Sequence, residues 1–107
     1  MKKMIEADAG QVKAWVDAGE AVIIDVREAP ELIQARVPGA VHIPMLAFDP
    51  TPLDQQDGKK LIFMCAMGMR SMQVGTYLIQ NDMIEEGYNL AGGIKAWAMA
   101  GGEIEAG

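Results

Sequence analysis

The sequence predicts an α/β fold in which a largely parallel sheet is flanked by helices. Residues 21–25 and 61–65 form short apolar runs, each of which ends at an ionisable side chain; such runs are typical of strands buried on both faces of a parallel sheet. Strand patterns alternate with helical patterns along the chain, as in βαβ units. The 107 residues suit one domain spanning 1–107, and a hydrophobic content of 50% provides material for a core.

Capping residues and apolar spacing predict the elements of the first third. Asp8 is a suitable N-cap, and apolar residues then recur at helical spacing until Gly19 ends the helix. The run at 21–25 follows as a strand. A short helix is expected over 28–34, where Pro30 is tolerated in the first turn.

The middle of the chain is expected to contain a turn, a short strand and a long connection. Residues 37–40 predict the turn, and residues 41–43 predict a strand that Pro44 ends. Residues 49–60 are rich in Asp, Pro and Gly, so we expect a polar connection at the surface.

The last third repeats the strand and helix alternation. The strand at 61–65 is followed by a loop and by an amphipathic helix over 70–81. A final short strand is predicted over 88–90. Gly92-Gly93 then breaks the chain before a closing helix over 94–99.

Charge and hydropathy exclude several classes of partner. The net charge of −6 and the isoelectric point of about 4.6 disfavour nucleic acid, because an acidic surface repels phosphates. No apolar run approaches the roughly 20 residues of a membrane span, and Lys2-Lys3 precedes too short an apolar stretch for a signal peptide. We therefore expect a cytoplasmic protein with no membrane or nucleic-acid partner.

The residue inventory also limits the chemistry. One cysteine and one histidine exclude an internal disulfide framework and a Cys-rich zinc site, so no metal is expected. The sequence contains neither a dinucleotide-binding fingerprint nor a phosphate loop with its lysine, so no cofactor is expected.

The segment from Cys65 to Ser71 is the candidate site. A strand-to-helix loop can turn several backbone N–H groups toward one point and form an anion-binding nest, to which the helix dipole adds. Arg70 contributes a permanent positive charge, and Gly68 supplies the positive φ that a tight loop often requires. Ser71, at the helix start, can cap the helix or bond a bound anion. These features favour a Cys65 thiolate, which is the nucleophilic form.

A simpler interpretation of Cys65 is that it is a small buried hydrophobic residue, which is the commoner role of a single cysteine after a strand. The spacing of Cys65 and Arg70 around Gly68 favours a nucleophile instead. The loop alone does not distinguish sulfur chemistry from phosphate chemistry.

Four motifs in order resemble the rhodanese family over nearly the whole chain. They are Asp25-Val26-Arg27-Glu28, Val37-Pro38-Gly39-Ala40-Val41-His42-Ile43-Pro44, the loop from Cys65 to Ser71, and Leu90-Ala91-Gly92-Gly93-Ile94-Lys95-Ala96-Trp97. The resemblance implies a three-layer sandwich with a five-stranded, mainly parallel sheet flanked by helices. It also implies transfer of a sulfane sulfur from a donor, such as thiosulfate, a persulfide or a polysulfide, through Cys65 to a thiol or cyanide.

The resemblance assigns Cys65 as the catalytic residue and the loop residues Ala66, Met67, Gly68, Met69, Arg70 and Ser71 as the substrate-binding set. Four residues separate Cys65 from Arg70, which gives the six-residue loop of the family's sulfurtransferases. The related phosphatases and arsenate reductases have a longer loop and are disfavoured. A non-enzymatic sulfur carrier or sensor that acts with a protein persulfide partner remains a second hypothesis.

The interior of the loop departs from the thiosulfate-preferring members of the family. Ala66, Met67 and Met69 are uncharged where those members tend to have basic residues, and thiosulfate is a dianion. We therefore expect a persulfide or polysulfide donor. The two methionines either face a substrate or partner or, like most of the nine methionines of the chain, fill the core.

Several other residues are expected to have structural roles. Asp25 and Arg27 are expected to support the loop or to pair with each other, and His42 is expected to be a structural histidine. Gly92-Gly93 is expected to permit a close approach of the last helix to the loop. Four acidic residues are expected to be solvated, one on the helix over 28–34 and three at the end of the helix over 70–81: Glu31, Asp82, Glu85 and Glu86.

Overall fold

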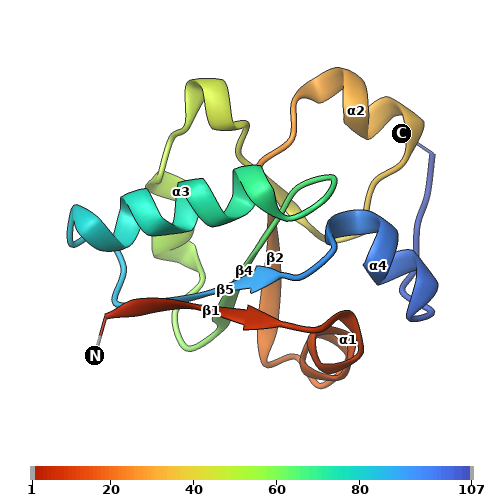
Figure 1. Ribbon diagram of the computed structural model, residues 1–107, viewed down its shortest axis with the longest axis horizontal. Helices are drawn as coiled ribbons and strands as arrows, with labels where there is room; N and C mark the ends of the chain where they lie inside the picture. Colours follow the sequence, from red (N-terminus) through yellow and green to blue (C-terminus); the bar gives the residue numbers. More distant parts are fainter. Residues whose placement is uncertain (1, 107) are drawn as a thin grey trace.

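The computed structural model describes residues 2–106, which form a five-stranded sheet with helices on both faces (Figure 1). The strands are β1 (Lys3–Ala7), β2 (Ala21–Asp25), β3 (Val41–His42), β4 (Lys60–Met64) and β5 (Glu86–Leu90). Their order in the sheet is β1-β5-β4-β2-β3, and every neighbouring pair is parallel. The predicted three-layer α/β architecture is confirmed.

The helices divide between the two faces of the sheet. Helices α1 (Ala9–Asp17) and α4 (Gly93–Met99) cover one face, and α3 (Met69–Gln80) covers the other. The short helix α2 (Ala29–Gln34) lies beyond the carboxyl end of β2, and two 3₁₀ helices, η1 (Met45–Ala47) and η2 (Thr51–Gln55), lie between β3 and β4. The N-cap prediction is confirmed, because the carboxylate of Asp8 accepts the backbone N–H of Gln11 at 2.8 Å.

The sequence patterns alone missed strand β1. Its five residues begin with Lys3 and include Glu6, and both of these side chains are exposed. Because β1 is an edge strand that pairs only with β5, it tolerates charged residues that a central strand would bury at high cost. The apolar run that identifies a buried strand is therefore absent from it.

The acidic segment after α3 also differs from the prediction. Helix α3 ends at Gln80, and Asp82 adopts a positive φ of 57° in the turn that follows. Glu86 is the first residue of β5, two residues before the predicted start. It was wrong to assign Glu86 to a solvated helix end, because an exposed carboxylate fits equally well at the first position of a strand.

The core has two halves, one on each face of the sheet, and β4 contributes to both. Ile62 and Met64 pack with residues of α1 and α4, whereas Phe63 packs with residues of α3. This alternation is the two-residue period of a strand. Cys65, the residue after β4, continues the alternation and directs its side chain toward α3.

A buried ion pair stabilises the chain at the carboxyl end of β2. Asp25 and Arg27 are 1% and 4% exposed, and Arg27 donates from Nη2 to the Asp25 carboxylate at 2.8 Å. The same nitrogen donates to the carbonyl oxygen of Ala35, just after α2. His42 Nε2 lies 2.7 Å from the carbonyl oxygen of Arg27, which confirms a structural role for this histidine. Together, these contacts of Asp25 and Arg27 connect β2 with β3 and with the end of α2.

Gly93 allows α4 to approach the loop that follows β4. Gly93 has a φ of 66°, and a Cβ added there would lie 2.6 Å from the carbonyl oxygen of Cys65 and would overlap the carbonyl group of Ala66. The backbone N–H of Ile94 donates to the Cys65 carbonyl at 3.0 Å. The predicted close approach at Gly92-Gly93 is confirmed.

Within residues 2–106, no helix combines the length and the apolar character that crossing a membrane would require.

The contact at Gly93 yields a stability prediction with a matched control. Gly93→Ala is expected to lower the free energy of unfolding by about 3 kcal/mol or more, because the backbone strain adds to a steric overlap. Gly19→Ala introduces a similar positive-φ strain, at 75°, with no atom within 4 Å of the added Cβ, and is expected to cost about 1 kcal/mol. Urea unfolding followed by circular dichroism measures both. Equal losses would show that the close approach is not a constraint.

Candidate active site

Cys65 lies between the end of β4 and the start of α3, with its side chain 1% exposed. The backbone N–H of Gly68 donates to Sγ at 3.0 Å, and the Ser71 hydroxyl lies 3.4 Å from Sγ. The loop therefore brings its N–H groups to the sulfur, as the sequence predicted. The predicted strand at 61–65 was shifted by one residue, because β4 spans Lys60–Met64 and ends before Cys65.

Gly68 gives the loop its shape. Its φ of 103° lies in the left-handed region, which favours glycine because a side chain there would be strained. The turn directs the Gly68 N–H toward the sulfur and its carbonyl toward β5. That carbonyl accepts a hydrogen bond from Asn89 Nδ2 at 3.0 Å, so both polar groups of the residue are satisfied.

The surroundings of Cys65 lower the pKa of its thiol. Burial acts in the opposite direction, because it disfavours the charged thiolate. The hydrogen bond from the Ser71 side chain and the backbone N–H groups of Ser71, Gly68 and Met67 outweigh burial, so the pKa of Cys65 lies below its ordinary value. The site favours the thiolate through neutral dipoles.

Asn89, in β5, is a site residue that the sequence analysis missed. It is 2% exposed; its Nδ2 donates to Gly68 O, and its Oδ1 lies 2.5 Å from the Ser71 hydroxyl. Ser71 has a single hydroxyl hydrogen, so it donates either to Asn89 or to the sulfur. A thiolate therefore competes with Asn89 for this hydrogen. The available signal was an Asn within the predicted final strand over 88–90, since a polar side chain there needs a partner if the strand is buried.

The structure corrects the expectation for Glu31. Instead of being solvated, its carboxylate pairs with Arg70: Nη1 and Nη2 donate to Oε2 and Oε1, each at 2.8 Å. The hydrogen bonds from Arg70 lower the pKa of Glu31 to about 2, against the opposing effect of burial. The same pairing raises the pKa of Arg70. Much of the positive charge expected to act on Cys65 is therefore offset by a neighbouring carboxylate.

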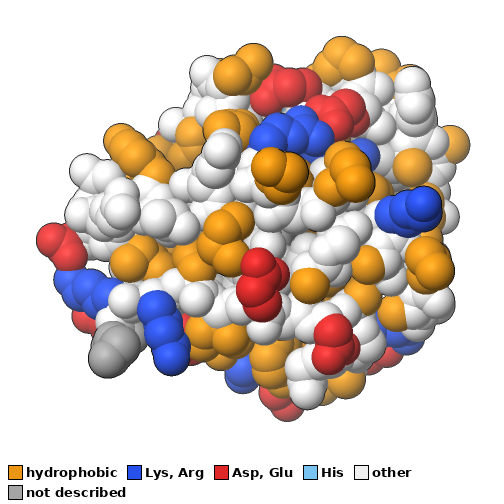
Figure 2. Space-filling model, in the orientation of Figure 1, with side chains coloured by type: hydrophobic (Ala, Val, Ile, Leu, Met, Phe, Trp, Pro, Cys, Tyr) orange, Lys and Arg blue, Asp and Glu red, His pale blue; other side chains and the backbone are white. Residues whose placement is uncertain are grey.

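Met67 and Met69 are exposed, at 77% and 75%, so the alternative in which they fill the core was wrong. They line a shallow cavity of about 350 Å³ at the mouth of the loop, together with Cys65, Ala66, Arg70 and Gln73. Above the loop, the molecular surface shows basic atoms enclosed between acidic and hydrophobic side chains (Figure 2). Because four of its six lining residues are Cys, Ala or Met, the mouth of the site is largely apolar.

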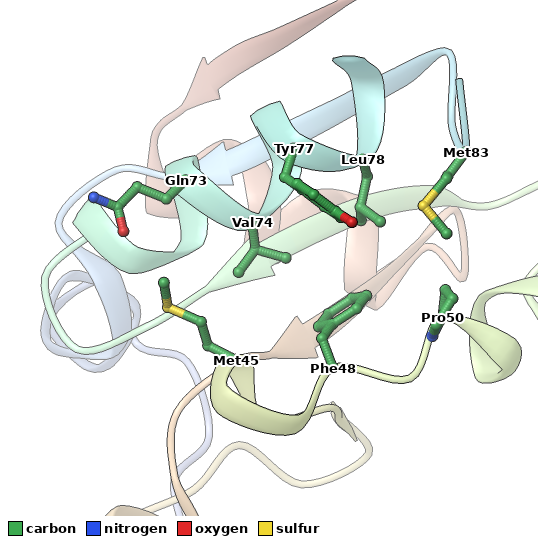
Figure 3. A pocket seen from close by; sticks show the side chains of 8 residues that line it. All are labelled: Met45, Phe48, Pro50, Gln73, Val74, Tyr77, Leu78 and Met83. Carbon is green, nitrogen blue, oxygen red and sulfur yellow. The ribbon is translucent and has the colours of Figure 1, made fainter. Parts of the chain in front are cut away.

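A second, larger cavity of about 410 Å³ lies along α3 (Figure 3). Val74, Tyr77 and Leu78 line it from α3, and Met45 and Phe48 face them from the segment after β3. Gln73 borders both this groove and the mouth of the loop. The groove does not include Cys65.

Asp25 and Arg27 do not contact the sulfur. Arg27 instead lines a small hollow with Glu31 and Ala66, and it is bound to Asp25. Of the two expected alternatives, the structure shows Asp25 and Arg27 paired with each other, next to the segment that carries Glu31. Within residues 2–106, no group of three or more His, Cys, Asp or Glu side chains is arranged to hold a metal ion.

Comparisons with known proteins identify relatives of this chain. The Rhodanese-like domain family matches residues 8–100. The chain is 38% identical over 94 residues to YtwF of Bacillus subtilis, a protein named provisionally as a sulfurtransferase, and the match covers 86% of this chain and 88% of that protein. It is 26% identical over 106 residues to the thiosulfate sulfurtransferase GlpE of Vibrio cholerae, covering 99% of each.

A solved structure extends the comparison to the fold. The crystal structure of a thiosulfate sulfurtransferase from Pseudomonas aeruginosa superposes with a TM-score of 0.79 at 30% identity, covering 97% of this chain and 20% of that one. The resemblance inferred from the four motifs is thereby confirmed. With a family match that spans most of its length, the chain belongs to the rhodanese-like domain family.

Proposed function

We propose that this protein is a sulfurtransferase in which Cys65 accepts a sulfane sulfur and passes it to a thiophilic acceptor. The observation that carries the proposal is the 3.0 Å hydrogen bond from the Gly68 N–H to the Cys65 sulfur, inside a loop that lowers the thiol pKa. A thiolate is required to attack a sulfane sulfur, and the terminal sulfur of a persulfide is also anionic. The same N–H groups suit both states.

The first step forms a bond between Cys65 Sγ and the outer sulfur of the donor. With a hydropersulfide, the S–S bond of the donor breaks, and the released thiolate takes the electron pair and the proton. In the second step, an acceptor thiolate attacks the terminal sulfur and Cys65 leaves as a thiolate; with cyanide, the product is thiocyanate. Each step is a displacement at sulfur with no net oxidant or reductant.

The donor we propose is a persulfide or polysulfide rather than thiosulfate. The mouth of the loop exposes two methionine side chains, and the guanidinium of Arg70 is already paired. A dianion gains little from such a surface, whereas a donor with an apolar group gains contact area. The exposed methionines also favour the second candidate, a carrier that exchanges sulfur with one protein partner, because Met is common at adaptable binding surfaces.

Intact-mass spectrometry tests the proposed role of Cys65. After incubation with a hydropersulfide, the wild-type protein is expected to gain one sulfur atom, and cyanide is expected to remove it as thiocyanate. Cys65→Ser is expected to gain none, because the hydroxyl of serine does not form the persulfide. The same experiment with thiosulfate compares the two donors, and we expect slower loading.

Three other results would redirect the assignment. Equal labelling of the wild type and of Cys65→Ser would contradict the proposal. Loading without transfer to cyanide or to small thiols would favour the partner-dependent carrier. Cleavage of an aryl phosphate that depends on Cys65 would favour the phosphatase alternative.

The hydroxyl of Ser71 is expected to set part of the reactivity of Cys65. Ser71→Ala removes a hydrogen-bond donor to the thiolate, so the pKa of Cys65 should rise and its alkylation by iodoacetamide at neutral pH should slow by about threefold or more. The rate of alkylation as a function of pH measures both quantities. Thr76→Ala, which removes a hydroxyl further along α3, is the control and should leave the profile unchanged. Coincident profiles for Ser71→Ala and the wild type would contradict the assignment.

A further inference from the structure

The ion pair between Glu31 and Arg70 joins two elements that are far apart in the sequence. Glu31 lies in α2 and Arg70 in the first turn of α3. The pairing is bidentate, with both N–O distances at 2.8 Å, and each side chain is about one-third exposed, at 34% and 35%. Planar two-point pairing of this kind sets the orientation of the guanidinium as well as its charge.

Glu31 is itself held in place. Its Oε2 accepts the backbone N–H of Glu28 at 2.8 Å, as part of a capping box at the start of α2. The segment that leads into α2 is in turn anchored by the buried pair of Asp25 and Arg27. The Glu31 carboxylate is therefore held in place before it pairs with Arg70, and the pair forms without movement of α2.

The pairing affects the site because Arg70 is the cation that lines the mouth of the Cys65 loop. The charges that act most strongly on it are negative, namely Glu31, the Cys65 thiolate and Glu28. A dianionic donor that enters the mouth would have to displace Glu31 from the guanidinium or bind without a direct cation contact. A donor with one negative charge or none gains less binding free energy from contact with a cation. It therefore loses less when the guanidinium of Arg70 is already occupied.

We propose that Glu31 is a positioning residue that sets donor specificity: by occupying the guanidinium of Arg70, it withholds that cation from dianionic donors and favours persulfides of low charge. This inference rests on the proposed sulfurtransferase function and adds the residue that determines its selectivity. Glu31 touches neither the sulfur nor the donor and acts through Arg70. With its pKa lowered to about 2, Glu31 stays ionised throughout the neutral range.

The test compares two donors in wild type and in Glu31→Gln. Gln preserves the volume and can still accept the Glu28 N–H, since the capping box allows either residue. The kcat/KM for thiosulfate is expected to rise about tenfold, mainly through a lower KM, which corresponds to one charge-assisted hydrogen bond gained by the donor. The kcat/KM for an alkyl hydropersulfide, which carries at most one negative charge, is expected to change by less than about threefold. Thiocyanate formation is the readout, after subtraction of the Cys65→Ser rate.

Two controls separate release of Arg70 from a general change in charge. Glu28→Gln removes a negative charge close to the same arginine without breaking the bidentate pair, so it should leave the preference between donors nearly unchanged. In an Arg70→Ala background, Glu31→Gln should no longer improve the use of thiosulfate, because the two effects act through one group. The gain should also diminish at high ionic strength.

A binding measurement keeps this inference separate from the proposed reaction. In Cys65→Ser, which carries out no transfer, thiosulfate titrated against backbone NMR shifts should bind about tenfold more tightly when Glu31→Gln is added. Tighter binding together with no sulfur loading of the wild type would refute the proposed function and support the role of Glu31. Normal loading of the wild type, with unchanged thiosulfate binding and unchanged KM in Glu31→Gln, would overturn the inference alone.

Discussion

A buried sulfur surrounded by N–H donors is the constraint on which the rest of this structure depends. Cys65 is 1% exposed, and burial opposes the thiolate that sulfur chemistry requires. In the loop from Cys65 to Ser71, hydrogen bonds from the Gly68 N–H and the Ser71 hydroxyl stabilise the thiolate against this effect of burial. They can form only while the loop keeps the shape that the positive φ of Gly68 gives it. Neighbouring elements maintain that shape: Asn89 binds the Gly68 carbonyl from β5, and α4 packs against the loop through Gly93. The sheet order places these elements together.

Dipoles and formal charges have separate roles around the site. The groups closest to the sulfur are neutral N–H and O–H donors, which favour a single negative charge without attracting multiply charged anions from a distance. The formal cation at the mouth, Arg70, is paired with Glu31 and is surrounded by other negative groups on a protein of net charge −6. On the proposed function, this division lets the loop favour a thiolate while it disfavours a dianionic donor. It also gives the exposed methionines, Met67 and Met69, a larger share of the contact with any donor.

Much of the fold was predictable because it depends on local patterns. The buried strands β2 and β4 have continuous apolar runs, and Asp8 caps α1 as its residue type suggests. The edge strand β1 escaped detection because its exposed positions carry Lys3 and Glu6, and the resemblance to the family, rather than periodicity, supplied the count of five strands. The start of β5 was misplaced for a similar reason, since Glu86 is an exposed residue at the beginning of a strand.

The sequence by itself determined the family, the positions of the buried strands along the chain and the loop from Cys65 to Ser71, because each is encoded by residues that are close together in the chain. The partners of that loop were decided only by the tertiary structure. Glu31 pairs with Arg70 across 39 positions of the chain, and Asn89 meets Ser71 across 18. No local pattern distinguishes an acidic residue that will be solvated from one that will meet an arginine. The distinction arises when parallel strands bring their carboxyl ends, and the segments that follow them, to one edge of the sheet.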